Sequence, residues 1–241
     1  MNGLNTLQQL VDLSQRIVFF GGAGVSTESG IPDFRSQDGL YNQQYDYPPE
    51  MILSRSFFQA EPFEFYRFYR DKVLALSARP NAAHLKLAEL EAAGKLLAVV
   101  TQNIDGLHQQ AGSKQVWELH GSVWRNHCTK CRKAFAPEYI VAAAEVPLCD
   151  TCGAIIEPDV VLYEDGLDSD VIAGAVAAIR AADMLIIGGT SLVVYPAAGL
   201  VRHFTGERLA VLNMDGTGSN LRDALLIREP IAKVLKQLVV R

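Results

Sequence analysis

The sequence predicts an α/β fold built on a doubly wound parallel sheet. Three observations support this prediction: short apolar runs that end in small or polar residues, helical patterns between these runs, and two irregular stretches that interrupt the alternation. The chain has 241 residues, 49% hydrophobic and 20% charged, which is the composition of a packed globular protein and excludes disordered and fibrous classes. We expect one domain, residues 1–241, that carries insertions.

The apolar runs are interpreted as buried strands. They are IVFF after Arg16, LLAVV after Lys95, MLII after Asp183 and LAVLN after Arg208. Continuous hydrophobicity is typical of parallel strands that are covered on both faces. Residues 81–94 and 169–183 have helical patterns, and we expect Leu85, Leu87 and Leu90 on the apolar face of the first helix. This alternation of strands and helices indicates a doubly wound sheet.

Two stretches break the alternation. Residues of about 36–80 are aromatic and rich in helix breakers, then helical through EPFEFYRFYRDKVL, which indicates an inserted helical module. Residues of about 122–161 carry all four cysteines and are too irregular for a sheet crossover, so we interpret them as a second inserted module. The large domain would then comprise residues of about 1–35, 81–121 and 162–241.

The four cysteines have the spacing of a zinc ribbon. Cys128, Cys131, Cys149 and Cys152 form C-x2-C-x17-C-x2-C, in which two knuckles each present two thiolates to one tetrahedral ion. Two disulfides or unrelated thiols are the alternatives, and a cytosolic location argues against stable disulfides. Four thiolates leave no open position for water, so the Zn²⁺ should be structural. His127 could compete as a ligand, although the cysteine set is complete without it.

A glycine-rich turn follows the first predicted strand. Backbone N–H groups after Gly22-x-Gly24 could bind a pyrophosphate at a helix N-terminus, although Thr27 stands where the dinucleotide fingerprint has a third glycine. A tight strand-to-helix turn is the alternative. Polar residues also follow three other strands, in TQNIDGLH, GGTS and NMDG, and such strand ends bind ligands in open α/β sheets. Together they favour a dinucleotide, whereas no GK[ST] motif supports phosphoryl transfer.

Side chains at the other strand ends could contact this ligand. Thr190 and Ser191 are candidates for phosphate or ribose contacts, and Asn213 is a candidate for a ribose or adenine contact. Capping and turn roles are the alternatives for each of these residues. Directly after the glycine turn, Asp33 and Arg35 flank an aromatic residue, and the arginine could bind phosphate with two hydrogen bonds.

The residues that could take part in catalysis lie after the second predicted strand and before the cysteines. Asn103 and Asp105 supply an amide and a carboxylate, and His120 precedes a glycine. A histidine near its unperturbed pKa of about 6.5 can act as a base at neutral pH. His84 and His203 lie in helical stretches, and we expect both to be structural.

Charge and hydropathy limit the other partners. The formal net charge is −5 and no run of like charges occurs, so we expect no nucleic acid. Residues 184–201 lack charge, but glycines, hydroxyl residues and Pro196 interrupt them, so we expect no membrane span. The first residues lack the pattern of a signal peptide, and we expect a cytoplasmic location. The sequence leaves the oligomeric state open.

The ordered motifs resemble those of the sirtuins, the NAD-dependent protein deacylases. They are GAGVSTESGIPDFRS, TQNIDGLH, the ELHG before the first CxxC, the two CxxC knuckles, GTSLVVYPAAG and VLNMD. The resemblance extends from about residue 14 to about residue 238 and suggests a compact bacterial or archaeal form. It implies a Rossmann-like large domain with an inserted zinc ribbon and a small helical module, with NAD between the large domain and the inserts.

The resemblance also implies roles for individual residues. The implied NAD contacts are Gly22, Ala23, Gly24, Thr27, Asp33, Phe34, Arg35, Gln102, Asn103, Ile104, Asp105, His120, Gly189, Thr190, Ser191, Asn213 and Ile231. Among them, Ile104, Asp105 and Phe34 would hold the nicotinamide. His120 would be the general base, Asn103 would orient a water or hydroxyl, and Asp105 would help to protect a cationic transition state.

The implied reaction joins NAD to an acetylated-lysine protein or peptide. The acyl oxygen attacks the nicotinamide ribose and nicotinamide leaves; the products are free lysine and O-acyl-ADP-ribose. The peptide would add as a strand beside Val160, Val161 and Tyr163. This segment departs from the common family form, which has arginine before the proline and Phe-Gly-Glu where Tyr163-Glu164-Asp165 stand, so the peptide preference is open.

Two further questions concern the acyl group and the class of activity. Sirtuins that favour succinyl or malonyl groups carry a tyrosine and, three residues on, an arginine; here Tyr66 is followed by Tyr69, and Arg70 comes one place late. One residue turns a helix by about 100°, so we expect acetyl and other uncharged acyl groups. The alternatives to deacylation are mono-ADP-ribosyl transfer and a non-catalytic zinc-ribbon binding module.

Overall fold

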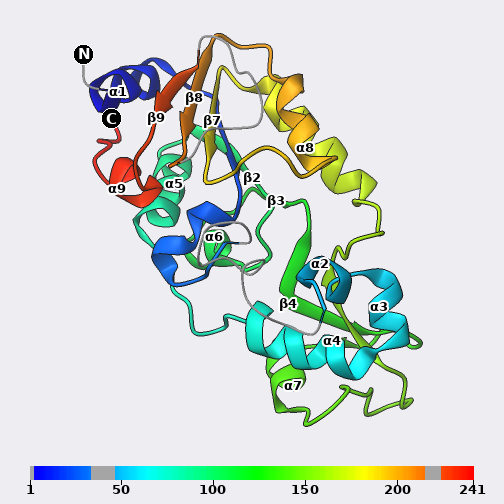
Figure 1. Ribbon diagram of the computed structural model, residues 1–241. Coiled ribbons are helices and arrows are strands. Elements are labelled where there is room, and N and C mark those ends of the chain that lie inside the picture. Colours follow the sequence, from blue (N-terminus) through cyan, green and yellow to red (C-terminus); the bar gives the residue numbers. More distant parts are fainter. Residues whose placement is uncertain (1–2, 34–46, 215–223) are drawn as a thin grey trace.

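The computed structural model describes residues 3–33, 47–214 and 224–241, and within them a six-stranded parallel sheet forms the centre of the larger lobe (Figure 1). Its order is β3-β2-β1-β7-β8-β9. The strands are β1 (Ile17–Gly21), β2 (Leu96–Thr101), β3 (Val116–Glu118), β7 (Met184–Gly188), β8 (Arg208–Leu212) and β9 (Leu225–Ile227). The expected doubly wound parallel sheet is confirmed, and its order is that of dinucleotide-binding folds.

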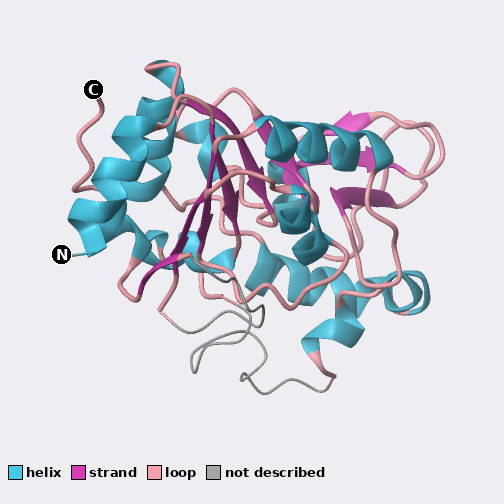
Figure 2. Ribbon diagram, turned by 90° about the horizontal axis from the view of Figure 1, so that it is seen from above, coloured by secondary structure: helices cyan, strands magenta, loops and turns pink. Residues whose placement is uncertain are grey.

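Helices cover both faces of this sheet. Ile17 and Phe19 of β1 face α1 (Gly3–Leu13), α5 (Ala82–Ala92) and α9 (Ile231–Leu235). Val18 and Phe20 face α8 (Ser169–Ala181) and the 3₁₀-helix η5 (Ala197–His203). Figures 1 and 2 show these helices on opposite sides of the strands. Because both sides are covered, all five residues of β1 are buried, as the continuous hydrophobic run predicts.

The two predicted helices form with clear end signals. Asn81 caps α5 by accepting a hydrogen bond from the Ala83 N–H at 2.9 Å, and Gly94 follows the helix at a φ of +74°. Leu87 and Leu90 are buried, but the prediction for Leu85 is wrong, because its side chain is 54% exposed. The buried face of α5 instead includes Ala83 and His84, which lie three or four residues before Leu87.

Two short edge strands complete the sheet. The strands β3 and β9 have three residues each, too few to give a hydrophobic pattern in the sequence. Residues 184–201 form β7, a turn and the start of η5. Across the described ranges, we find no helix with the length and hydrophobicity that a membrane span requires.

The smaller lobe combines helices with a second sheet (Figure 2). In the part of the chain that the structure describes, this sheet has the order β5-β4-β6. Its strands are β4 (Gly121–Cys128), β5 (Ala134–Phe135) and β6 (Ile156–Val160), and α7 (Pro137–Ala142) follows β5. The helices of this lobe that precede α5 in the chain are α2 (Pro49–Ile52), α3 (Arg55–Ala60), α4 (Pro62–Phe68) and the π-helical turn η4 (Tyr69–Val73).

The helical and cysteine-bearing segments share one hydrophobic core. Phe57, Phe65 and Tyr66 from the helices pack in the same cluster as Ile140 and Ile156 from the second segment. The buried thiols Cys128 and Cys149 also belong to this cluster. The two inserts therefore stabilise each other, and loss of either would expose the apolar face of the other.

Candidate functional site

The candidate site lies where β1 and β7 end side by side. From β1 the chain continues towards β2 on one side, and β8 follows β7 on the other side, so this is the point at which the strand order reverses. Ligands of open α/β sheets bind outside the carboxyl ends of the strands at such a point. The Gly21-Gly22 and Gly188-Gly189 pairs form this end of the sheet, where Gly22 N–H donates to the Gly188 carbonyl at 3.2 Å.

The glycine turn packs backbone against backbone. Gly24 N–H donates to the Gly189 carbonyl at 2.9 Å, and a Cβ at Gly24 would lie 2.8 Å from the Gly189 Cα. Gly189 has a φ of +58°, and a Cβ there would lie 2.4 Å from the backbone nitrogen of Val25. Only glycines allow this contact. It brings the two backbones together at the edge of the sheet where the sequence predicts a pyrophosphate.

The expected helix after this turn is replaced by two 3₁₀ turns. They are η1 (Ala23–Val25) and η2 (Thr27–Ser29), and Gly30 ends them at a φ of +82°. The macrodipole argument for anion binding therefore does not apply, because each turn has only three residues. Close backbone approach, rather than a helix end, is what the glycines provide.

A buried hydrogen-bonded chain connects the glycine turn to the end of β2. The Asn103 amide Nδ2 donates to Ser26 Oγ at 3.1 Å, and Ser26 Oγ donates to Asp105 Oδ2 at 2.6 Å. The Leu107 N–H donates to the other carboxylate oxygen at 2.9 Å, and the Trp124 indole donates to the Asp105 carbonyl at 2.7 Å. Asn103 and Asp105 are thus held in fixed orientations by Ser26, which sequence reasoning missed.

Gln102 links the second strand end to Thr190 and His120. Its Nε2 donates to Thr190 Oγ1 at 3.1 Å, and its backbone N–H donates to the Gly21 carbonyl at 3.0 Å. His120 Nδ1 lies 2.9 Å from the Gln102 carbonyl. Because a carbonyl can only accept, Nδ1 carries the proton and Nε2 is left with a free lone pair.

The electrostatic surroundings keep His120 neutral. Burial lowers the pKa of His120 below its usual value of 6.5, and the hydrogen bond to the Gln102 carbonyl opposes this shift only in part. At neutral pH the imidazole is therefore unprotonated at Nε2. This is the form that a general base requires.

The remaining residues predicted to contact the cofactor differ in their burial and in their hydrogen bonds. Thr27, the first residue of η2, donates from its hydroxyl to the Gly24 carbonyl of η1 at 3.1 Å, and Ser191 is half-buried next to Thr190. Ile104 is half-buried and its carbonyl accepts from the Val123 N–H. Asp33 is described, whereas Phe34 and Arg35 lie outside the described residues.

At the far end of the site, Asn213 and Ile231 differ in how much surface they expose to a ligand. Asn213 directly follows β8 and is half-buried, and its N–H donates to the Ile227 carbonyl at 3.1 Å. Ile231 is only 3% exposed and belongs to the core beneath the sheet. Its side chain packs against Gly188, so it supports the strand end and presents little surface to a ligand.

The predicted peptide segment lies beside His120. Gly121 pairs with Val160 in the antiparallel ladder of β4 and β6, and the Val161 N–H donates to the His120 carbonyl at 3.0 Å. Within the described residues, β6 is an edge strand of its sheet, with β4 as its neighbouring strand. Val160 and Val161 are half-buried, and Tyr163 is 42% exposed.

Tyr66 and Arg70, the residues tied to acyl preference, are both engaged with the second segment. The Tyr66 hydroxyl donates to the Ile156 carbonyl. Arg70 Nη1 donates to the Glu145 carbonyl at 2.8 Å, and its guanidinium lies 5.8 Å from the centre of the Tyr66 ring. Tyr69 is fully buried. Arg70 is therefore used in joining the two inserts.

The four cysteines come together in one cluster. Their sulfur atoms all lie within 4.8 Å of one another, with Cys128 Sγ 3.4 Å from Cys152 Sγ and Cys131 Sγ 3.6 Å from Cys149 Sγ. All four thiols are free, and a tetrahedral zinc ion with Zn–S bonds of about 2.3 Å would have S···S edges of about 3.8 Å. The donor set and its spacing fit one structural zinc ion.

Backbone N–H groups prepare these sulfurs to bind a cation. The N–H groups of Lys130 and Cys131 both point at Cys128 Sγ at 3.4 Å. Although desolvation favours the thiol, these hydrogen bonds lower the pKa of Cys128 to about 6. His127 Nε2 lies 4.0 Å from a Glu157 carboxylate oxygen and is not a member of the cluster.

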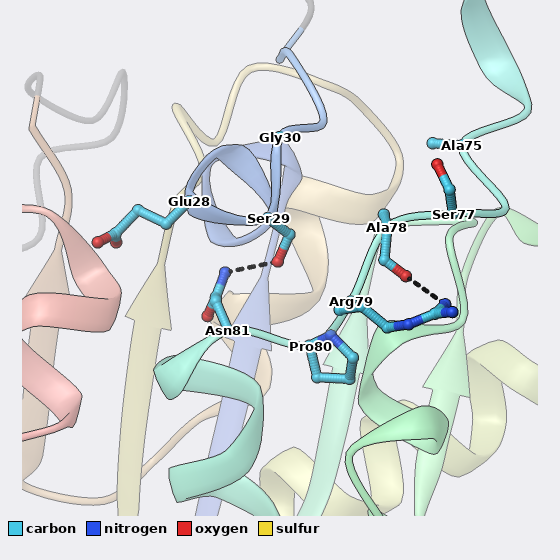
Figure 3. Close-up of a pocket in the computed structure, with 9 residues that line it drawn as sticks. All are labelled: Glu28, Ser29, Gly30, Ala75, Ser77, Ala78, Arg79, Pro80 and Asn81. Atoms are coloured by element: carbon cyan, nitrogen blue, oxygen red, sulfur yellow. Dashed lines mark hydrogen bonds between the residues drawn. The ribbon is translucent and has the colours of Figure 1, made fainter.

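A separate pocket of about 490 Å³ lies beside the second 3₁₀ turn (Figure 3). It is lined by Glu28, Ser29, Gly30, Ala75, Ser77, Ala78, Arg79, Pro80 and Asn81, none of which belongs to the predicted cofactor set. As Figure 3 shows, Asn81 donates to Ser29, at 3.0 Å, and the same amide donates to the Val25 carbonyl at 2.8 Å. Asn81 therefore fixes the glycine turn to the start of α5.

Comparison with known proteins identifies close relatives. Residues 22–196 match the sequence model of the Sir2 family. The chain is 53% identical to an NAD-dependent protein deacetylase of Clostridium acetobutylicum over 242 residues, covering 99% of both chains. It is 42% identical to an NAD-dependent protein deacetylase of Staphylococcus aureus over 240 residues, covering 99% of this chain and 98% of the relative.

Solved structures agree with these relatives. A Sir2 variant with a deacetylated p53 peptide and 3′-O-acetyl ADP ribose has a TM-score of 0.88 and 37% identity, with coverage of 97% of this chain and 96% of the other. A Sir2 complex with p53 peptide and NAD⁺ has a TM-score of 0.84 and 38% identity, covering 97% and 95%. These similarities extend over both lobes.

Proposed function

Because the chain belongs to the Sir2 family, the sirtuins, we propose that it is an NAD-dependent protein lysine deacetylase whose general base is His120. The observation that carries this proposal is the position of His120, between the switch point of the sheet and an edge strand. A neutral base there can serve a dinucleotide on one side and a peptide on the other. The products would be lysine, nicotinamide and O-acyl-ADP-ribose.

The strand ends fit NAD as co-substrate. The contacting backbones of Gly22, Gly24 and Gly189 leave no side chain between a pyrophosphate and the sheet, which suits close approach of phosphates. Gln102 and Thr190 offer hydrogen-bonding groups at the same edge. When bound, NAD supplies a glycosidic bond to nicotinamide and an ADP-ribose group that accepts the acyl group.

For the remaining contacts to NAD, we propose the residues that the sequence motifs imply. The set also includes Ala23, Thr27, Asp33, Phe34, Arg35, Ser191 and, at the adenosine end, Asn213. Asp105 and Ile104 would face the nicotinamide, and the Ser26 hydrogen bond would hold the Asp105 carboxylate in a fixed orientation. A fixed negative charge stabilises developing positive charge without reorganisation.

His120 and Asn103 have complementary tasks. His120 donates from Nδ1 to the Gln102 carbonyl, so Nε2 is the atom that takes a proton from a ribose hydroxyl. Ser26 holds the amide nitrogen of Asn103, which fixes the direction of its amide oxygen. That oxygen can then accept a hydrogen bond from a water or hydroxyl.

The substrate is an acetylated-lysine segment of a protein or peptide. An extended peptide can add to the edge strand β6, where backbone pairing gives affinity without a strict sequence requirement. Val160, Val161 and Tyr163 would line the lysine stem. Because Arg70 is engaged with the Glu145 carbonyl, its guanidinium is not available for a distal carboxylate, which supports acetyl and other uncharged acyl groups.

The zinc ion would hold the smaller lobe together and take no part in the reaction, since four thiolates complete its coordination. We propose the functional division given above: a large domain of residues of about 1–35, 81–121 and 162–241, a helical module of about 36–80 and a zinc module of about 122–161. A four-cysteine zinc site is typical of proteins in reducing compartments, which supports a cytoplasmic location.

The test uses NAD labelled in the adenylate phosphate together with an acetylated peptide. Deacetylation predicts that the label appears in a small acylated product, whereas mono-ADP-ribosyl transfer predicts that it becomes attached to protein. His120→Ala should abolish turnover while calorimetry still detects NAD binding. Normal turnover by this variant would remove His120 from its assigned role.

A further inference from the structure

Arg55, at the start of α3, contacts both ends of the segment that carries the proposed peptide-binding residues. Its Nη1 donates to the Glu157 carboxylate, which lies before this segment. Its Nε and Nη2 donate to the two oxygens of the Asp165 carboxylate, which lies after the segment, at 2.9 and 2.8 Å. We name Arg55, Glu157 and Asp165 the Arg55 clasp.

The clasp is connected to the backbone of the segment. Asp165 Oδ2, which receives a hydrogen bond from Arg55, also accepts from the Leu162 N–H at 3.0 Å, and the Asp165 N–H donates to the Leu162 carbonyl at 3.0 Å. Arg55 and Asp165 form a two-bond pair whose geometry only a guanidinium can match. Their side chains are 27% and 20% exposed, so solvent screens this pair less than a surface pair.

Neighbouring contacts fix the same segment to α3. The Tyr163 N–H donates to the Leu53 carbonyl at 2.9 Å, and the Arg55 N–H donates to the Tyr163 carbonyl at 3.0 Å. The Glu164 carboxylate accepts from the Ser56 N–H and hydroxyl, both at 2.9 Å. Glu164 adopts a φ of +80°, a conformation that favours glycine, and these two hydrogen bonds offset that cost.

At its other end the segment is bonded to the base. The Val161 N–H donates to the His120 carbonyl at 3.0 Å. The backbone from residue 161 to residue 165 therefore extends from His120 to the helical module, and the Arg55 clasp holds its far end. A shift of this end would move the edge that receives the peptide, while the glycine turn and Gln102 would stay in place.

We propose that Arg55 is a positioning residue that sets the geometry of the peptide-binding edge and thereby the affinity for the acetylated peptide. This inference rests on the proposed deacetylase function. It also gives a physical reason for the unusual acidic residues of the segment: Glu157 and Asp165 supply the two carboxylates that one guanidinium joins. Arg55 acts through this segment and touches neither the peptide nor NAD.

The test compares Arg55→Met, Arg55→Lys and a control, Arg67→Met. Arg67 pairs with Glu64 within α4, so this variant removes a cation from the same module without touching the segment. For Arg55→Met we expect the KM for an acetylated peptide to rise about tenfold, equivalent to about 1.4 kcal/mol, with the KM for NAD unchanged. Arg55→Lys should fall between the parent and Arg55→Met, because an ammonium keeps the charge but not the fork.

A cycle with Asp165→Asn tests whether the effect travels through the clasp. The double variant Arg55→Met/Asp165→Asn should be less impaired than the product of the two single effects, because either change already breaks the pair. Peptide binding to the unreacted proteins, followed by fluorescence polarisation without NAD, should weaken in parallel with the KM. Thermal unfolding verifies that each variant is folded at the assay temperature.

Three results would contradict the proposal. They are a peptide KM and peptide affinity within twofold of the parent, a rise in the KM for NAD that matches the rise for peptide, and multiplicative effects in the double variant. If the parent protein itself failed to deacetylate the peptide, the proposed function would be wrong. If the parent deacetylates the peptide and the Arg55 variants keep its peptide KM, only the proposed role of the Arg55 clasp would be rejected.

Discussion

Gly24→Ala tests the backbone contact on which the dinucleotide site depends. The added Cβ would lie 2.8 Å from the Gly189 Cα and 3.0 Å from its carbonyl oxygen, so the two loops must separate by about 0.7 Å to reach ordinary contact. That movement weakens the hydrogen bonds from Gly24 N–H and Gly22 N–H to the opposite loop. At about 1 kcal/mol each, the free energy of unfolding should fall by about 2 kcal/mol, within the range for overpacked sites.

Urea denaturation measures this loss of stability, and calorimetry measures NAD binding. In a chain of this length a loss of about 2 kcal/mol lowers Tm by about 4–8 °C, and we expect NAD to bind about tenfold more weakly. Gly199→Ala is the matched control: its Cβ would lie 3.8 Å from the Tyr195 ring, and it should leave stability unchanged or slightly higher. Parental stability and NAD affinity in Gly24→Ala would refute the reasoning.

Four further predictions concern protonation, a buried histidine and the metal. Burial lowers the pKa of His120, so peptide deacetylation should rise with pH to a plateau with a midpoint below 6.5, and a midpoint above 7 in kcat/KM profiles would contradict a buried neutral base. Burial also lowers the pKa of His84 to about 4 and that of His108 well below 6.5. Below pH 6.5 the unfolded chain therefore binds more protons than the folded chain. The free energy of unfolding should fall as pH drops from 6.5 towards 4, by about 3 kcal/mol for His84. Both ring nitrogens of His108 are buried and have no hydrogen-bond partner among the described residues, so His108→Phe should keep or raise stability and flatten this slope in urea titrations at pH 7 and 5; an unchanged slope would exclude His108 as a contributor. Chelation of zinc, or Cys128→Ser, should unfold the smaller lobe because two of the four thiols, those of Cys128 and Cys149, belong to its core; a zinc-free protein with parental circular dichroism and Tm would overturn that expectation.

Sequence patterns predict the strands that are buried along most of their length. Continuous apolar runs give the strands β1, β2, β7 and β8, because both faces of each strand are covered. The prediction for Leu85 is wrong because leucine occurs both on the buried and on the exposed face of a helix. Only the packing of α5 against the sheet decides which face Leu85 occupies. The three-residue edge strands have no room for a pattern.

Contacts between distant residues explain what the sequence could not show. Ser26 and Asp105 are 79 positions apart, and nothing in the local sequence distinguishes Ser26 from an ordinary turn serine. The same holds for the Arg55 clasp, which joins residues 102 and 110 positions apart. The cysteine spacing, in contrast, predicts its cluster directly, because each CxxC knuckle is a local unit that needs only one partner.

The most direct test of the deacetylase function is mass spectrometry of an acetyl-lysine peptide incubated with the protein, with and without NAD. The structure and family predict deacetylated peptide, nicotinamide and O-acetyl-ADP-ribose in equal amounts, and only when NAD is present. Nicotinamide release without loss of the acetyl group, or peptide deacetylation without NAD, would contradict the proposed function.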